Sequence, residues 1–383
     1  MAEIHLTKEE TQRYARHLVL PTVGEEGQKK LKASCVLIVG AGGLGSAALM
    51  YLATAGVGKV GIVEYDTIEL SNLHRQPLYG ASDVGKAKLQ VAAERIQQIN
   101  PYVQVVKHDA RLTSQNALQI LSAYDVVVDG SDNLPTRYLV NDACVMLGKP
   151  DVYGAVFQLE GQASVFDARK GPCYRCLFPE PPAPELVPSC SEAGVLGMIP
   201  GIIGNVQALE AVKIIVGIGS TLVGRLILFD ASTMDFRELK LEKLSTCPVC
   251  GPNPSIRSLI DYEEFCGVRH VDSGEEKAPA IHVSVRELKR RLDRGDKPIL
   301  LDVREPFEYE LVHLDARLIP LNSLPDKMKE LKRGDDIVVY CHTGLRSLSA
   351  VEFLRSQGFM NVKNLDGGID AWAREIDQSM VRY

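Results

Sequence analysis

The chain has 383 residues, of which 45% are hydrophobic and 24% are charged, a composition typical of a globular protein with two or three domains. The net charge of −6 argues against nucleic acid or an anionic membrane as the main partner. The N-terminal residues lack the basic-then-apolar pattern of a secretion signal, and the longest uncharged run, Ala193–Leu209, is too short and too interrupted by glycine and proline for a membrane span. We therefore expect a cytoplasmic protein, whose nine cysteines favour metal ligation and reactive thiols over disulfides.

The first part of the chain predicts an amphipathic helix, Glu9–Val19, and then alternating strands and helices. Short apolar strands separated by helical segments form parallel sheets with right-handed crossovers. The pattern therefore predicts an α/β domain with a parallel sheet. Its strands are expected at Cys35–Val39, Lys59–Glu64, Gln104–His108 and Asp125–Asp129, and its helices at Gly45–Ala55, Val84–Ile99 and Asn116–Ser122.

The pattern changes after this alternation. Residues Asp151–Phe166 predict paired strands, and the proline-rich stretch Phe178–Pro188 predicts a loop, because it cannot form a helix. Pro200–Gly217 predicts a second buried helix, and Arg225–Leu241 predicts further strands.

A polar stretch, 252–280, predicts a linker between a first domain, 1–251, and a second domain, 281–383. The second domain is predicted to be a small α/β unit of about a hundred residues. Its clearest elements are expected at Val283–Leu292, Ile299–Val303, Ile337–Tyr340 and Ser347–Gln357.

The segment 40–45, GAGGLG, matches the pattern G-x-G-x-x-G between a strand and a helix, and the acidic residues Glu64 and Asp66 follow it after about twenty residues. Glycines allow the backbone to turn tightly and to approach a phosphate, which then meets the helix N-terminus. The simplest interpretation is NAD binding, and a tight turn without a ligand is the alternative.

Polar residues follow further strands of the same sheet. They are the loop Asp66–Gln76, Lys88 on the next helix, and Asp132 and Asn133 after a later strand. Because parallel strands end on the same edge of a sheet, these groups should converge on one crevice. Its cations, amides and carboxylates suit a triphosphate with Mg²⁺ better than a dinucleotide.

Four motifs in order carry a specific resemblance: VLIVGAGGLGSAALMYLATAGVG, DTIELSNLHRQ, SDNLPTRYLVND and CYRCLFP. Over about residues 5–251 the chain resembles the molybdopterin-synthase and thiamine-pathway adenylyltransferases, the bacterial relatives of ubiquitin-activating enzymes, whose adenylation domain is Rossmann-like. The resemblance implies that the C-terminal glycine of a small β-grasp sulfur-carrier protein ending in Gly-Gly attacks the α-phosphate of ATP. It also implies a homodimer.

The same resemblance assigns the site residues. Arg75 and Asp132 would be catalytic, and Arg16 would reach into the partner subunit's site. The family often has aspartate where this chain has Glu64, which can still accept the ribose hydroxyls. The residues expected to bind ATP and Mg²⁺ are Gly42, Gly43, Glu64, Asp66, Ser71, Asn72, Leu73, His74, Arg75, Gln76, Lys88, Asp132 and Asn133.

Two C-x-x-C pairs, Cys173/Cys176 and Cys247/Cys250, are separated by 70 residues. Each pair places two thiolates on one turn, and two turns complete a tetrahedron for Zn²⁺. A site with four sulfur ligands has no open position, so the zinc would be structural. A redox pair or buried cysteines are the alternative.

Cys190 follows the proline-rich loop and precedes SEAGV, which could open a helix whose dipole favours a thiolate. By resemblance, this position can take the activated carrier as a thioester or an acyl-disulfide. The alternative is a spare thiol in a loop.

The segment CHTGLRS, 341–347, connects a predicted strand to a predicted helix. Backbone N–H groups of such a loop point at the sulfur of Cys341, Gly344 permits the curl, and Arg346 adds a positive charge, so a thiolate or persulfide would be stabilised. Four residues separate the cysteine from the arginine, one fewer than in a tyrosine-phosphatase loop. The smaller cradle suits sulfur rather than phosphate.

Residues 281–383 resemble the rhodanese family through LLDVREPFEYE, HLDARLIPL, the Cys341 loop and LDGGIDAWAR. Asp302 and Arg304 are expected to be structural. Asp315 stands where the family usually has glycine. An inactive docking module is the alternative to an active sulfurtransferase.

Together these features predict a bifunctional adenylyltransferase and sulfurtransferase, in which a Cys341 persulfide attacks the carrier's acyl-adenylate and a thiocarboxylate results. Cysteine desulfurase or thiosulfate would supply the sulfur. The pathway would be molybdopterin synthesis. Thiamine synthesis, cysteine synthesis and transfer-RNA thiolation are the other candidate pathways. Two alternative functions remain: an adenylation-only activator with a docking rhodanese unit, and an NAD oxidoreductase.

Overall fold

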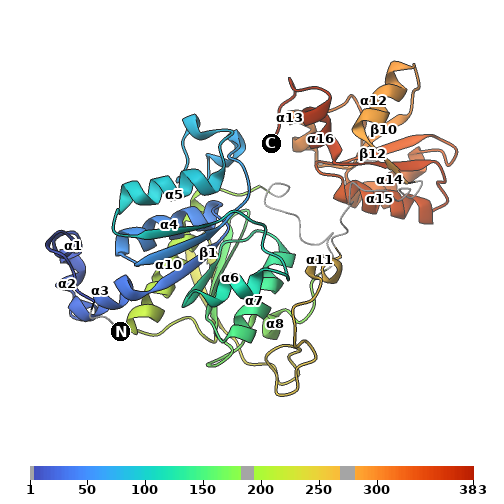
Figure 1. Cartoon of the computed structure of the whole chain (residues 1–383). Helices are drawn as coiled ribbons and strands as arrows, with labels where there is room; N and C mark the ends of the chain where they lie inside the picture. The colour runs from blue at the N-terminus through green and yellow to red at the C-terminus, as the bar shows by residue number, and fades with distance from the viewer. Residues whose placement is uncertain (1–3, 183–193, 268–280) are drawn as a thin grey trace. The chain divides into compact units, whose positions relative to one another are not determined.

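The computed structural model describes residues 4–182, 194–267 and 281–383, and the chain divides into two compact units (Figure 1). The described part of the first unit reaches residue 267, and residues 281–383 form the second. Each unit contains its own sheet with flanking helices. The predicted α/β class is confirmed for both.

The first unit contains an eight-stranded sheet with the order β3-β2-β1-β4-β5-β6-β7-β8. The strands from β3 to β5 pair in parallel, whereas β5 to β8 pair antiparallel. Because β1 lies between β2 and β4, the chain order reverses beside β1, which is where doubly wound sheets bind ligands. The strands are β1 Cys35–Val39, β2 Lys59–Val63, β3 Gln104–His108, β4 Val126–Asp129, β5 Asp151–Phe157, β6 Glu160–Phe166, β7 Arg225–Asp230 and β8 Asp235–Lys240.

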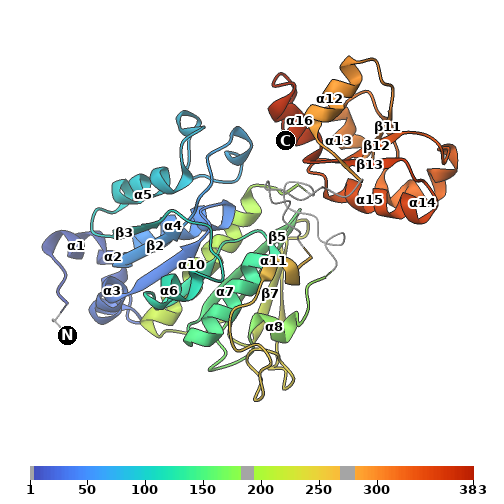
Figure 2. The ribbon, with the colours of Figure 1, turned by 45° about the vertical axis from the view of Figure 1, so that its right-hand side comes forward.

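Helices cover both faces of this sheet (Figures 1 and 2). Along β1, Val36 and Ile38 enter one hydrophobic core with α3, α4, α5 and α10, while Leu37 and Val39 enter the other with α6, α7, α8 and α11. This alternation follows from the two-residue period of a strand. The helices are α3 Gly24–Ala33, α4 Gly43–Ala55, α5 Lys88–Ile99, α6 Ala117–Ser122, α7 Leu134–Leu147, α8 Tyr174–Leu177, α10 Met198–Val216 and α11 Tyr262–Phe265, with short 3₁₀ turns at Leu70–Asn72 and Ala81–Asp83.

Two predicted helices differ from the structure. The helix expected over Glu9–Val19 is divided into α1 (Lys8–Arg13) and α2 (Ala15–Leu18). The break falls at Tyr14, whose buried hydroxyl accepts a hydrogen bond from Asn100 Nδ2 at 2.8 Å. The helix expected from Val84 begins only at Lys88, because Gly85 has a φ of +85°.

Helix α10 is the one described helix that is long and apolar enough to cross a membrane by length and composition. Half of the residues in its most apolar stretch are buried. It packs against α4, and its residues Ile199, Ile203 and Ala208 belong to the hydrophobic core. The helix therefore has the burial expected of a core element.

The linker predicted over 252–280 is wrong in its first part. Tyr262 and Cys266 are buried in the core of the first unit, and the Tyr262 hydroxyl donates to Asp142 Oδ2 at 2.9 Å. The composition of this segment is polar, but these two side chains are sufficient to attach it. Residues 252–267 thus belong to the first unit.

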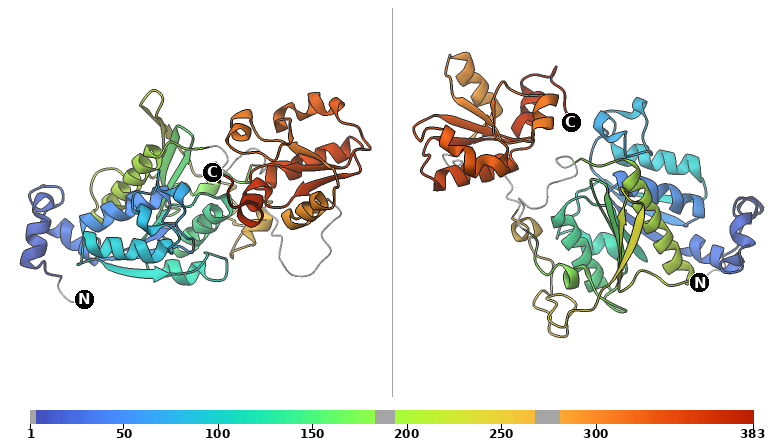
Figure 3. Two further views of the ribbon diagram at one scale, coloured as in Figure 1. Left: turned by 90° about the horizontal axis from the view of Figure 1, so that it is seen from above. Right: turned by 180° about the vertical axis from the view of Figure 1, so that it is seen from behind.

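The second unit has a five-stranded sheet with the order β11-β10-β12-β13-β9, in which all neighbours are parallel. This unit is drawn in orange and red in Figure 3. Two hydrophobic clusters lie on its two faces, one around Val339 and one around Val338. The strands are β9 His282–Val283, β10 Ile299–Asp302, β11 Arg317–Leu318, β12 Ile337–Tyr340 and β13 Val362–Leu365. The helices are α12 Val285–Asp293, α13 Pro306–Leu311, α14 Leu324–Lys327, α15 Leu345–Ser356 and α16 Gly368–Glu375, with 3₁₀ turns at Leu321–Ser323 and Met328–Glu330.

Candidate active sites and metal centre

The ends of three neighbouring strands meet at one edge of the first sheet. Val39 of β1 is level with Val63 of β2 and with Asp129 of β4. The Gly40 N–H donates to the Val63 carbonyl and the Gly130 N–H donates to the Val39 carbonyl, both at 2.9 Å. The three segments predicted to form a crevice therefore leave the sheet side by side.

The turn after β1 can be made only with glycine at two positions. A Cβ on Gly45 would lie 1.9 Å from the Gly40 carbonyl oxygen, and Gly40 itself has a φ of +85°. Helix α4 begins at Gly43, so its first N–H groups have no partner within the helix. Such a helix start is suited to phosphate.

The loop after β2 lies over this turn. A Cβ on Gly43 would be 3.4 Å from the Arg75 carbonyl oxygen, and one on Gly42 would be 3.8 Å from Gln76 Nε2. Gln76 is buried, and its Oε1 has no hydrogen-bond partner among the described residues. The structure thus brings Gly42, Gly43, Arg75 and Gln76 together, as the sequence predicted.

Within the loop, Arg75 Nη1 donates to the Ser71 carbonyl and contacts His74 Nε2, each at 2.9 Å. Burial lowers the pKa of His74, and the charge of Arg75 lowers it further, so the ring is a neutral acceptor. The Asn72 side chain accepts the Glu69 N–H at 3.1 Å, and Leu73 packs against the core. The guanidinium of Arg75 is thus held at the surface of the loop by groups of the loop itself.

Glu64 connects the second strand to the glycine turn. Its Oε2 accepts the Ala41 N–H at 2.9 Å, and its Oε1 accepts the N–H groups of Tyr65 and Asp66 at 2.8 and 3.0 Å. The carboxylate is nearly buried. Since each carboxylate oxygen has two lone pairs, Glu64 can fix the turn and still accept from a ribose.

Two further groups reach the same edge from α5 and β4. Lys88 opens α5 with a buried ammonium group 3.2 Å from the half-exposed carboxylate of Asp66. Asn133 caps α7 by accepting the Thr136 N–H at 3.0 Å, and its Nδ2 lies 3.4 Å from Asp132 Oδ1. Asp132 is exposed, so its carboxylate is open to a cation.

Sequence reasoning missed the group that supports Asp132 from below. Arg137 donates to the Ser131 carbonyl and to the Tyr153 hydroxyl, both at 3.0 Å. Asp129 accepts the Ser131 N–H at 2.9 Å, and burial raises the pKa of this carboxyl and of Asp151. The signal was an arginine in the first turn after an N-capping asparagine, but nothing local shows that it points inward.

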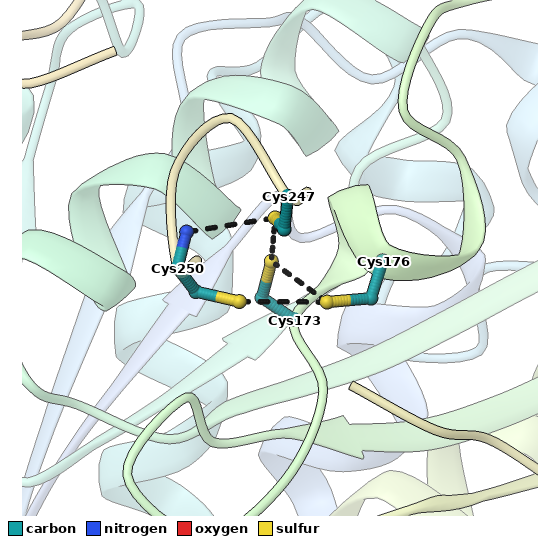
Figure 4. Close-up of side chains that lie close together, drawn as sticks. All are labelled: Cys173, Cys176, Cys247 and Cys250. Atoms are coloured by element: carbon teal, nitrogen blue, oxygen red, sulfur yellow. Dashed lines mark hydrogen bonds between the residues drawn. The ribbon is translucent and has the colours of Figure 1, made fainter. Parts of the chain in front are cut away.

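The four predicted metal ligands converge (Figure 4). The sulfur atoms of Cys173, Cys176, Cys247 and Cys250 lie within 4.8 Å of one another, and neighbouring pairs are separated by 3.4–3.9 Å. Tetrahedral Zn²⁺ with Zn–S bonds of about 2.3 Å requires sulfur separations of about 3.8 Å. Disulfides would require about 2.05 Å. The geometry therefore fits one tetrahedral ion with four thiolate ligands.

A buried ion pair anchors this cluster. Arg175, between the first two cysteines, is fully buried and forms a bidentate pair with Asp142 at 2.9 Å. Its guanidinium lies 4.7 and 4.4 Å from the ring centroids of Tyr138 and Phe265. Asp142 also accepts the Tyr262 hydroxyl. The cysteine cluster, α7 and α11 are thus joined by one polar network that the sequence did not reveal.

Arg175→Met should lower the free energy of unfolding of the first unit by about 3–5 kcal/mol, because it leaves the Asp142 carboxylate buried without its partner. Urea unfolding of the full chain, followed by far-ultraviolet circular dichroism, measures the change. Arg257→Met, at an exposed position, is the matched control. The sole tryptophan, Trp372, lies in the second unit, and its fluorescence transition should not shift.

The double variant Arg175→Met/Asp142→Leu should be more stable than Arg175→Met alone, since no charge remains buried. A double variant that is less stable than the single one would contradict this account of the pair.

In the second unit, Cys341 follows β12 and is fully buried. Its Sγ accepts a hydrogen bond from the Gly344 N–H at 3.1 Å and one from Ser347 Oγ at 3.4 Å. Gly344 has a φ of +101°, and α15 begins directly after it. Of the loop N–H groups predicted to point inward, that of Gly344 does so, and its positive φ permits the predicted curl, while the contribution of Ser347 was not predicted.

The charge expected from Arg346 is offset in the structure. Its guanidinium forms two hydrogen bonds with Glu308 at 2.7 and 2.8 Å. Burial acts to raise the pKa of Glu308, but the bonds and charge of Arg346 prevail and hold it below its usual value. Asp302 and Arg304 form a fully buried pair at 2.6 Å, so their predicted structural role is confirmed.

Two predicted residues remain to be placed. Arg16 is the second residue of α2 and is exposed. Cys190 lies outside the described residues. Asp315, which stands in place of the expected glycine, has a φ of +50° and an exposed side chain, so aspartate occupies a left-handed turn position.

The class of protein is set by the two units together. The first is a doubly wound sheet with a glycine turn and a four-cysteine cluster, and the second is a small parallel α/β unit with a cysteine in a loop. The ThiF family model matches residues 14–249, and the rhodanese-like domain model matches residues 284–375. The chain belongs to the ThiF family and carries a C-terminal rhodanese-like domain.

The similarity to curated proteins extends over the whole chain. A Mycobacterium tuberculosis protein named probable adenylyltransferase/sulfurtransferase MoeZ is 46% identical, over 99% of this chain and 96% of its own length. The Culex quinquefasciatus adenylyltransferase and sulfurtransferase MOCS3 is 43% identical, over 99% and 90%. The crystal structure of E. coli MccB with succinimide has a TM-score of 0.56 at 22% identity and covers 62% of this chain and 74% of that one, which supports the fold alone.

Proposed function

We propose that this chain adenylates the C-terminal glycine of a small β-grasp sulfur-carrier protein and then replaces the adenylate with sulfur carried on Cys341. It is an adenylyltransferase and a sulfurtransferase that uses ATP, as full-length relatives with both activities in their names support. The observation that carries the proposal is that one chain holds both a glycine turn at a helix start, which suits phosphate, and a cysteine that accepts hydrogen bonds from the groups around it.

In the first step, a carboxylate oxygen of the carrier attacks the α-phosphate of ATP. A P–O bond forms, the bond to the β-phosphate breaks, and pyrophosphate leaves. Arg75 and Lys88 would offset the phosphate charge, the N–H groups at Gly42 and Gly43 would hold phosphate oxygens, and Asp132 would hold Mg²⁺, which neutralises charge that develops on the leaving group. The other residues assigned to this site are Glu64, Asp66, Ser71, Asn72, Leu73, His74, Gln76 and Asn133.

In the second step, the outer sulfur of a Cys341 persulfide attacks the acyl-adenylate carbonyl and AMP leaves, which gives an acyl-disulfide on Cys341. A thiolate, which we assign to Cys190, then attacks the Cys341 sulfur. The carrier leaves as a thiocarboxylate, and a Cys190–Cys341 disulfide remains for a cellular thiol to reduce. Cysteine desulfurase or thiosulfate would renew the persulfide.

The remaining assignments concern the assembly. The cysteine cluster would hold a structural Zn²⁺. A homodimer would place Arg16 in the partner's crevice, and the exposure of Val19 and Leu20, 72% and 47%, supports a contact on that side. We place the enzyme in the cytoplasm, where its adenylation domain and its rhodanese domain, residues 281–383, would feed molybdopterin synthesis or a related thiolation.

Asp132→Asn should lower carrier-dependent ATP–pyrophosphate exchange by roughly 10²–10³-fold, because it removes the carboxylate charge that would hold Mg²⁺ in place to stabilise the transition state. Radioactive pyrophosphate exchange into ATP, with a carrier ending in Gly-Gly, measures the effect. Asp315→Asn is the matched control, since that side chain is exposed in the second unit. Normal ATP–pyrophosphate exchange by the Asp132 variant would refute the assignment of Asp132 to the site. Exchange in the absence of any carrier would refute the carrier protein as the substrate.

A further inference from the structure

The residues after α16 return to the cysteine loop. The Tyr383 ring stacks on the imidazole of His342, with centroids 4.4 Å apart and planes inclined by 17°. His342 directly follows Cys341 and is buried. Arg382 fastens the same segment through a bond from its Nε to Asp370 Oδ1 at 2.9 Å. The side chain of Tyr383, which follows α16 in the sequence, thus packs against the cysteine loop.

The Tyr383 hydroxyl joins two buried charges. It accepts a hydrogen bond from Arg304 Nη1 at 2.5 Å and donates one to Glu308 Oε1 at 3.1 Å. Arg304 is itself fixed by Asp302, and Glu308 holds Arg346 in the first turn of α15, just after the loop. Burial raises the pKa of the phenol, so the hydroxyl keeps its proton and can donate to the carboxylate.

Tyr383 therefore reaches both ends of the segment 341–346, which comprises the cysteine loop and the first two residues of α15. It reaches His342 through its ring and Arg346 through Glu308. The Gly344 N–H that bonds to the sulfur lies between these two ends. A donor that must meet a developing thiolate is effective only if its position is fixed.

We propose that Tyr383 is a positioning residue for sulfur transfer at Cys341, which acts through His342 and Glu308. The inference rests on the proposed function, because it assigns a role within the Cys341 reaction. Displacement of a reacting group by about 1 Å can cost about 10²-fold in rate. Loss of the contacts of Tyr383 should therefore reduce the rate of sulfur transfer, although no residue of the loop is changed.

The first test is steady-state sulfur transfer by the full chain, with thiosulfate as donor and cyanide as acceptor. Tyr383→Ala should lower kcat by about tenfold or more and change the KM for thiosulfate by less than about twofold, since the ring positions the nucleophile rather than the donor. Tyr383→Phe keeps the stacked ring and loses both hydroxyl bonds, and it should recover part of the rate. Val381→Ala, at an exposed position in the same segment, should match the parent chain.

The second test asks whether Tyr383 acts through His342. The losses caused by Tyr383→Ala and His342→Ala should not multiply in the double variant, because residues that act as a unit are non-additive. Losses that multiply in full would overturn the proposed route, and a Tyr383→Ala enzyme with parental kcat would overturn the proposal itself.

Trp372 fluorescence shows whether the second unit of each variant is folded, and ATP–pyrophosphate exchange shows the same for the first. If Tyr383→Ala fails to fold, Tyr383→Phe decides: the proposal requires the hydroxyl bonds to Arg304 and Glu308, so a normal kcat in that variant would reject it. Cys341→Ser separates the two levels. If it still transfers sulfur, the proposed function fails. If it is inactive while the Tyr383 variants are normal, only the positioning role fails.

Discussion

Cys341→Ser should abolish thiocarboxylate formation on the carrier, with a loss of at least about 10³-fold, while adenylation proceeds at its normal rate. The hydroxyl fits the same cradle, in which Gly344 and Ser347 donate to the atom at this position. However, oxygen cannot form the S–S bond that carries the transferred sulfur. Mass spectrometry of the intact carrier measures the product as the mass change for one oxygen replaced by sulfur, and pyrophosphate release measures the first step.

The matched control is Cys35→Ser, at a half-buried cysteine of the first unit that neither site uses. It should form the product normally. If Cys341→Ser forms thiocarboxylate as well as the parent chain with thiosulfate present, the rhodanese unit is a docking module and the adenylation-only function is correct. If adenylation is lost together with sulfur transfer, the two units are not functionally separate as we propose.

The sequence predicted most of the fold because the relevant signals are local. Strands such as β1 are short, continuous apolar runs, and glycine is required at position 45 because a Cβ there would meet the Gly40 carbonyl oxygen, only five residues earlier. The C-x-x-C pairs are equally local. Where the chain departs from periodicity for a local reason, as at Gly85, the boundary was misplaced by a few residues but the element was correct.

The features that the sequence did not reveal depend on contacts between distant positions. Arg175 finds Asp142 at a separation of 33 residues, and Tyr383 finds Arg304 at a separation of 79. Tyr262 attaches an apparently polar linker segment to the first unit through Asp142, 120 residues upstream. No periodic pattern encodes such pairs, because each side chain looks like an ordinary surface residue in its own segment.

Through Arg175, the cysteine cluster is connected to parts of the first unit outside the two C-x-x-C turns. Cys173 and Cys176 flank the arginine, and Asp142 and Phe265 receive it from α7 and α11. An ion that fixes the cysteine turn would therefore also fix the residues of the first unit that come last before the second. A defect at the cluster should spread into α11 rather than remain at the surface.

Cys173→Ser should remove the bound zinc and lower the free energy of unfolding of the first unit by roughly 5 kcal/mol or more, since zinc binding to a thiolate site is itself a large part of folding. Elemental analysis of the purified chain should give one zinc per chain for the parent and less for the variant. Circular dichroism in urea should show the destabilisation. Adenylation should fall only as far as the folded fraction falls, because a site with four sulfur ligands leaves no position for substrate.

The second unit serves as an internal reference in the same tube, because the Trp372 transition should stay at the parental urea concentration. Cys35→Ser controls for the loss of a thiol as such and should keep its zinc. A parent chain without zinc whose four thiols pair as disulfides would reject the metal assignment in favour of a redox cluster. A folded Cys173 variant that has lost its zinc but is inactive in adenylation would instead make the ion part of the catalytic machinery, which the buried position of Cys173 and the closed sulfur cluster argue against.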